Sequence, residues 1–159
     1  MTNAPQTMPR RWARNVAALA ATLWAGSLWG VGFLSVPVLF GTLPDRMLAG
    51  MLAGKMFTLV AWTGIASAAY LLIYLAATSG KRAYRQPLFL IAAGMLVLTL
   101  IGEFGLQPEM AALKAQAQPA DVLHSAFAGR FQMLHGIAHV IYTAQCLLGI
   151  GMVLKARDC

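Results

Sequence analysis

Charged side chains are scarce in this 159-residue sequence, which contains 12 Lys and Arg residues and 5 Asp and Glu residues. They amount to 11% of the chain, whereas an average soluble domain carries about a quarter. The surface of a soluble fold needs many polar residues, but 59% of these residues are apolar and the charges occupy a few short stretches. The composition therefore excludes an ordinary soluble protein and indicates a lipid bilayer as the main solvent.

Cysteine is also rare, and the signatures of nucleic-acid binding are missing. Cys146 and Cys159 have neither metal-type spacing nor the pattern of a disulfide framework, so both are predicted to be free thiols. The net charge of +7 comes from basic residues at the ends of apolar segments, without an aromatic-interleaved basic stripe or a Gly-rich phosphate loop. We therefore expect no nucleic-acid partner.

Long uncharged stretches dominate what is present. About 20 apolar residues suffice for a helix to cross the hydrocarbon core. Four stretches meet that length or come close to it, and they predict an all-α integral membrane protein, a four-helix bundle. The single four-span transmembrane domain is expected over 15–156, between a disordered basic lead at 1–14 and a tail at 157–159. The predicted spans are about 16–40, 57–78, 88–106 and 131–154.

Turn and cap signals lie between these spans. Thr42 can cap the second helix, with Pro44 and Asp45 in its first turn. The polar stretch 107–120, which contains two prolines, is expected to be a loop. Asp121 can then cap a helix that enters the membrane near Phe131.

The distribution of Lys and Arg predicts the orientation. If the N-terminus is inside, the inner segments hold eight of these residues and the outer segments hold four. Basic flanks are retained in the cytoplasm. The bias therefore predicts that both termini are cytoplasmic.

Polar residues at membrane depth form two stripes. On the fourth helix, His124, His135 and Tyr142 fall within about 20° of one another, and His139 lies about 60° away. On the third helix the polar residues recur every four positions, at Thr99, Glu103 and Gln107. If the stripes face each other, they enclose a small polar cavity that opens to the outside. Its ligand-binding residues would be Thr99, Glu103, Arg130 and Tyr142.

His135 and His139 have the H-x-x-x-H spacing by which two imidazoles on one helix can hold a metal ion. Glu103 would add a carboxylate, and His124 would stand at the entrance. Such ligands suit a transition metal such as copper. Two alternatives stay open: the imidazoles satisfy one another or the backbone within the bundle, or they form a proton or small-ligand site. Gly136 follows His135, so the H-E-x-x-H protease motif is missing, and no catalytic triad can be assembled, which argues against an enzyme.

Several short motifs resemble those of a known family. They are Trp24-Ala-Gly-Ser-Leu28, Pro37-Val-Leu-Phe-Gly-Thr-Leu-Pro44-Asp-Arg46, Ala53-Gly54-Lys-Met-Phe57, Arg130-Phe131 and Leu134-His135-Gly136. Together they resemble a bacterial membrane family of unknown function that is similar to the eukaryotic transmembrane protein 205.

The resemblance implies a four-span fold in the bacterial inner membrane and places Pro37, Gly54, Arg130, His135 and Gly136 in the family pattern. It implies no reaction. More remotely, the layout resembles copper-resistance membrane proteins and haem-linked protoporphyrinogen oxidases. The first three predicted spans contain no histidine, which disfavours haem held from two helices.

Three functional hypotheses follow. The first is handling of a metal ion or small cation at an outward-facing site between the third and fourth helices. The second is a non-catalytic accessory or scaffold protein of a membrane complex, which would pack on another membrane protein. The third is a small-molecule transporter that works as a homo-oligomer, because four helices rarely form a transport path alone.

Overall fold

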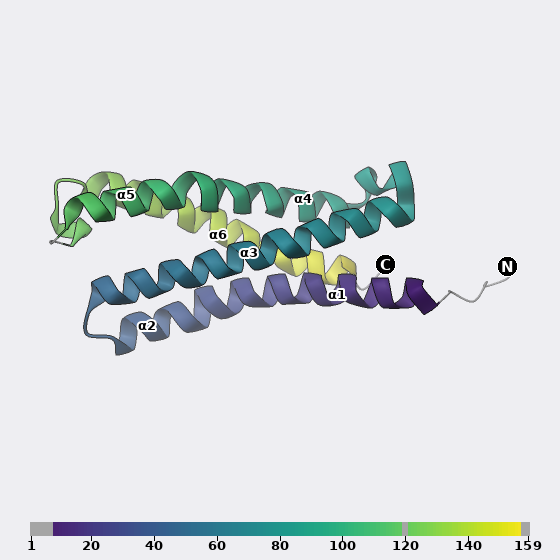
Figure 1. The fold of residues 1–159 in the computed structure, drawn as a ribbon, viewed down its shortest axis with the longest axis horizontal. Helices are drawn as coiled ribbons and strands as arrows, with labels where there is room; N and C mark the ends of the chain where they lie inside the picture. The colour runs from purple at the N-terminus through teal and green to yellow at the C-terminus, as the bar shows by residue number, and fades with distance from the viewer. Residues whose placement is uncertain (1–7, 119–120, 157–159) are drawn as a thin grey trace.

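The computed structural model describes residues 8–118 and 121–156, and these form long helices joined by short turns (Figure 1). Within this part of the chain, four helices are long and apolar enough to cross a membrane. Each of the four predicted spans lies within one of them. The all-α four-helix membrane bundle is therefore confirmed, and its apolar outer surface implies contact with lipid.

The first long helix consists of α1 (Met8–Trp29), η1 (Gly30–Ser35) and α2 (Val36–Thr42), which follow one another without a break. The disordered lead predicted for 1–14 is wrong for residues 8–14, because Ala, Arg and Trp there continue the helix of the span that follows. Residues 1–7 lie outside the described part. Thr42 ends α2, so it is not the cap of the second helix.

The second long helix, α3 (Arg46–Ser79), begins at Asp45, whose carboxylate accepts hydrogen bonds from the backbone N–H groups of Met47 and Leu48. It ends at Gly80, whose φ of 54° is a conformation that glycine adopts readily. The short turn η2 (Gly80–Arg85) then reverses the chain.

The third long helix consists of α4 (Pro87–Leu100), η3 (Ile101–Leu106) and α5 (Gln107–Ala117). The loop predicted for 107–120 is therefore wrong over 107–117. Pro108 does not break the helix because it sits in the first turn of α5, and the residues that follow it, rich in Ala and containing Leu and Lys, are strong helix formers.

Prolines explain why η1 and η3 are π-helical. Just before Pro37, the N–H of Val36 donates to the carbonyl oxygen of Val31, and just before Pro108 the N–H of Gln107 donates to that of Gly102. These bonds span five residues. A proline lacks an N–H and crowds the preceding turn, and the wider π turn relieves that crowding without ending the helix.

The fourth long helix, α6 (Ala128–Ala156), begins later than expected. Asp121 caps only the short turn η4 (Val122–His124), because the chain turns again before Ala128. His124 therefore does not lie on α6 and does not share a helical stripe with His135. Cys146 is buried and free, as predicted, while Cys159 and the rest of the 157–159 tail lie outside the described residues.

In the bundle, α1 packs against α3 and α6, and α4 packs against the same two helices. The buried core combines alanines with large apolar side chains, among them Trp24, Leu71 and Met95. One end of the bundle, the basic end, carries Met8, the turn η2 and Ala156; the other, the loop end, carries the 43–45 connection and the turn η4 (Figure 1).

Candidate functional site

The polar side chains of the bundle gather in two places, a layer near its middle and a cluster near the loop end. The middle layer joins the helices to one another. The Thr99 hydroxyl of α4 lies 2.9 Å from Gln145 Oε1 of α6, to which it donates, and equally close to the carbonyl oxygen of Met95. Both Thr99 and Gln145 are buried, so this contact is sealed within the bundle.

Three further hydrogen bonds tie α1 to its neighbours. Trp29 Nε1 donates to the carbonyl oxygen of Cys146 at 3.2 Å, and the Tyr142 hydroxyl donates to the carbonyl oxygen of Leu28. The Tyr70 hydroxyl of α3 donates to the carbonyl oxygen of Ala13 at 3.1 Å. Hydrocarbon offers no competing water, so such bonds hold the helices in one register.

Glycine makes the closest approaches in this layer. A Cβ on Gly64 would lie 2.4 Å from Trp24 Nε1, and one on Gly32 would lie 2.4 Å from the Tyr142 ring. The Trp24 side chain is completely buried. Within residues 8–118 and 121–156, its Nε1 is the one buried side-chain nitrogen or oxygen that has no hydrogen-bond partner. The indole therefore fills a space that only glycine leaves open.

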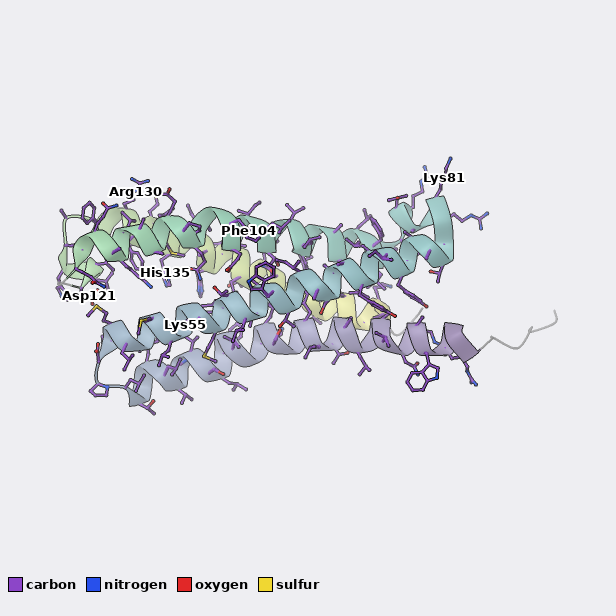
Figure 2. The ribbon with its side chains drawn as sticks, viewed as in Figure 1. Lys55, Lys81, Phe104, Asp121, Arg130 and His135 are labelled. Atoms are coloured by element: carbon purple, nitrogen blue, oxygen red, sulfur yellow. The ribbon has the colours of Figure 1, made fainter. Side chains whose placement is uncertain are left out.

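The bundle consists of two helical hairpins, the first from α1 to α3 and the second from α4 to α6, and the loop-end cluster belongs to the second. Phe131 and His135, one turn apart on α6, stack with ring centroids 5.9 Å apart, and the ammonium of Lys114 lies 5.5 Å from the Phe131 ring. His139 and Lys114 both act electrostatically on His135. Arg130 pairs with Glu109 at 2.9 Å, with both side chains exposed. Figure 2 shows His135 on the side of α6 that faces the first hairpin.

The predicted site residues are thus only partly brought together. Thr99 does face α6, as the two-stripe hypothesis required, but it meets Gln145. Tyr142 bonds to α1. Glu103, half-buried on η3, has no hydrogen bond or ion pair with any described residue, and His124 lies exposed on η4.

Metal binding finds little support in this geometry. Within residues 8–118 and 121–156, no three His, Cys, Asp or Glu side chains gather closely enough to hold one ion. His135 and His139 remain a pair, and the ammonium of Lys114 lies over the Phe131 ring that stacks on His135. Two exposed imidazoles beside a positively charged ammonium group form a poor binding site for a cation.

Gln145 and Trp29 were missed as polar contacts by sequence reasoning. Gln145 could have been found, because an amide within an uncharged span must pair inside the bundle. Trp29 gave no such signal, since tryptophan is common in membrane helices.

One family model matches this chain, over residues 19–119, and its description is "Domain of unknown function (DUF4149)". The match covers more than half of the chain, so the chain belongs to this family. The matched part includes both π turns and Thr99, whereas His135 and His139 lie beyond it. Among curated proteins and among solved structures, none matches the chain.

Proposed function

We propose that this protein is a non-catalytic accessory protein of the bacterial inner membrane, and that it binds a transmembrane helix of a partner between the loop-end halves of its two hairpins. Its basic end lies in the cytoplasm, because Arg11, Arg14, Arg82, Arg85 and Lys155 gather there. The acids of the described chain lie in the other half, at Asp45, Glu103, Glu109 and Asp121.

The observation that carries the proposal is the separation of the hairpins at the loop end. Toward the loop end, α3 packs on η1 and α2, and α6 packs on η3 and α5. No contact of similar extent joins α2 to α5 or α6. In Figure 1 the two hairpins accordingly diverge toward the loop end.

The side chains left uncovered there are mostly apolar. Leu34 and Val38 of the first hairpin and Met133 of the second are more than half exposed. Surfaces of this kind within the hydrocarbon region fit another apolar helix, which gains packing contacts on both sides. The buried Thr99–Gln145 contact closes the middle of the bundle, so the partner helix would extend from the loop end only as far as this contact.

Photo-crosslinking in cells tests this role. A photoreactive phenylalanine analogue at Val38 or Met133 should form one discrete adduct of the same mass from both hairpins. The matched controls are Leu19 and Ile73, which are at least as exposed but lie in the basic-end half. Absence of adducts from both hairpins, or the same adducts at the control positions, would contradict the proposal.

Metal handling is the second candidate, and one observation favours it. His135 and His139 are exposed and one turn apart on α6, a spacing at which two imidazoles can hold one ion whose remaining ligands come from the partner or from water. The resemblance to copper-resistance proteins makes copper the first ion to test.

Elemental analysis of the purified protein decides this second candidate. Stoichiometric copper, zinc or iron that is lost in His135→Ala and kept in His124→Ala would support it. If wild-type protein stays metal-free after incubation with these ions, metal handling is excluded and the accessory role is the candidate that remains.

A further inference from the structure

The two hairpins carry the same sequence pattern. Arg10-Arg11-Trp12-Ala13-Arg14-Asn15 at the start of the first corresponds to Lys81-Arg82-Ala83-Tyr84-Arg85-Gln86 at the start of the second. At the same spacing, Phe33 and Pro37 correspond to Phe104 and Pro108. In the second helix of each hairpin, Ala53-Gly54-Lys55 corresponds to Ala128-Gly129-Arg130, and Pro44 precedes the first as Pro119 precedes the second.

The structure places these pairs equivalently. Burial recurs at matched positions of α1 and α4: Ala17 with Leu88, Ala21 with Ala92, Trp24 with Met95, and Leu28 with Thr99. Both prolines follow a π turn; in the segment after each, Asp45 caps α3 and Asp121 caps the short turn η4. The bundle is thus two copies of one hairpin, related by an approximate two-fold axis along its length.

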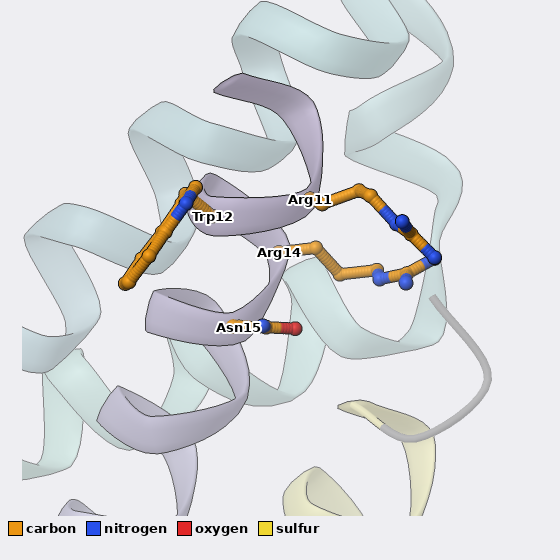
Figure 3. A pocket seen from close by; sticks show the side chains of 4 residues that line it. All are labelled: Arg11, Trp12, Arg14 and Asn15. Atoms are coloured by element: carbon orange, nitrogen blue, oxygen red, sulfur yellow. The ribbon is translucent and has the colours of Figure 1, made fainter. Parts of the chain in front are cut away.

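Both copies form a hollow at the basic end, beside the residue that closes the repeated motif. The first hollow, of about 340 Å³, is lined by Arg11, Trp12, Arg14 and Asn15, and Figure 3 shows both arginines extending away from Trp12. The second, of about 480 Å³, has Thr78, Ser79, Gln86 and Lys155 on its polar side and Tyr74 and Pro87 on its apolar side. Asn15 and Gln86 occupy the same position in the repeat.

The chemistry of the hollows favours an anion. Each has at least one cation and a side-chain amide, groups that donate hydrogen bonds to a phosphate. Gln86 donates to the Ser79 hydroxyl at 2.8 Å, which leaves that hydroxyl's proton available to an acceptor. Trp12 is 69% exposed, as suits a ring at the level of the lipid headgroups.

We propose that these two hollows bind anionic phospholipids of the leaflet at the basic end, one per hairpin. The phosphate lies among the arginines in the first hollow and beside Lys155 and Ser79 in the second. The first hollow lies along α1, and the second lies between α3, α4 and α6. Basic side chains at this level of a membrane suit such headgroups. The proposal depends on the membrane-spanning fold and is independent of the partner helix proposed above.

Native mass spectrometry of the full-length protein, with added phosphatidylglycerol or phosphatidylcholine, tests this. Wild type should retain two phosphatidylglycerol molecules and no phosphatidylcholine. Arg11→Gln/Arg14→Gln and Lys155→Gln should each retain one. Lys55→Gln, which removes an exposed charge at the loop end, is the matched control and should retain two.

Three results would overturn the proposal. Equal retention of both lipids would show no headgroup site, and equal loss in the Lys55→Gln control would show unspecific attraction to charge. Displacement by millimolar inorganic phosphate would show a site for the free anion rather than for a lipid. If the arginine variant does not fold, Gln86→Glu, which places a carboxylate in the second hollow, should lose one lipid, whereas Gln118→Glu at the loop end should lose none.

Discussion

The basic-end half and the loop-end half of this bundle differ in how their helices contact one another. In the basic-end half and the middle layer, α1, α3, α4 and α6 all touch their neighbours, and hydrogen bonds such as Thr99–Gln145 and Tyr70–Ala13 join them. In the loop-end half each hairpin packs mainly on itself, around the small cluster of Leu113, Ala117 and Val122 in the second hairpin. The first half therefore determines the fold, and the second is available for contacts with other molecules.

The strongest test of this comparison is Gly64→Ala in the packed half. The new Cβ would lie 2.4 Å from Trp24 Nε1, and the indole is completely buried and has no room to move. Overpacking of this kind costs about 1–3 kcal/mol. We expect a clear fall in the thermal unfolding temperature of the detergent-solubilised protein.

Gly94→Ala is the matched control, because a Cβ at Gly94 meets nothing within 4 Å. Its unfolding temperature should stay the same or rise slightly, since alanine favours a helix more than glycine does. Equal effects of the two substitutions would show that the Trp24–Gly64 contact does not hold the bundle together.

A smaller effect is expected from Thr99→Val, which removes the buried hydroxyl that meets Gln145 while keeping the side chain's shape. Hydrogen bonds between membrane helices contribute about 0.6 kcal/mol on average and about 1.7 at most. The free energy of unfolding should fall by an amount in this range. Thr22→Val, whose hydroxyl bonds only to its own helix on the exposed surface, should have no effect.

A double-mutant cycle sharpens this prediction. If the contact is direct, Gln145→Leu combined with Thr99→Val should cost less than the sum of the two single changes. Strict additivity would mean that Thr99 and Gln145 contribute separately.

Apolar run length and helix signals predicted the fold class, and each expected span lies within one long helix, because the bilayer leaves few alternatives to helices. The helix through 107–117 was missed because Pro108 and the polar residues around it are typical of a loop. What the sequence could not show directly is that a π turn absorbs the proline. A second π turn precedes Pro37, at the equivalent position of the first hairpin. This repeat is present in the sequence, but it is recognised only when the two halves of the chain are compared.

The candidate site was harder to predict for a different reason. Helical periodicity places Thr99 and His135 on faces of their own helices, but it does not fix how far one helix slides along its neighbour. Thr99 meets Gln145, nearly three turns along α6 from His135. His124 was placed on the wrong element, because Asp121 is an equally good cap for a short turn.

The smallest effect is expected in the loop-end half, at the ion pair of Arg130 and Glu109. Both side chains are more than half exposed, and exposed pairs contribute about 0–1 kcal/mol. Arg130→Gln should hardly change the unfolding temperature, and any change should diminish as salt is raised. Lys55→Gln is the control from the first hairpin, where Val38 takes the place of Glu109 and the cation has no such partner. If Arg130→Gln instead destabilised the protein as much as Gly64→Ala does, the loop-end half would be a structural part of the bundle, and a partner helix would have no separable surface on which to bind.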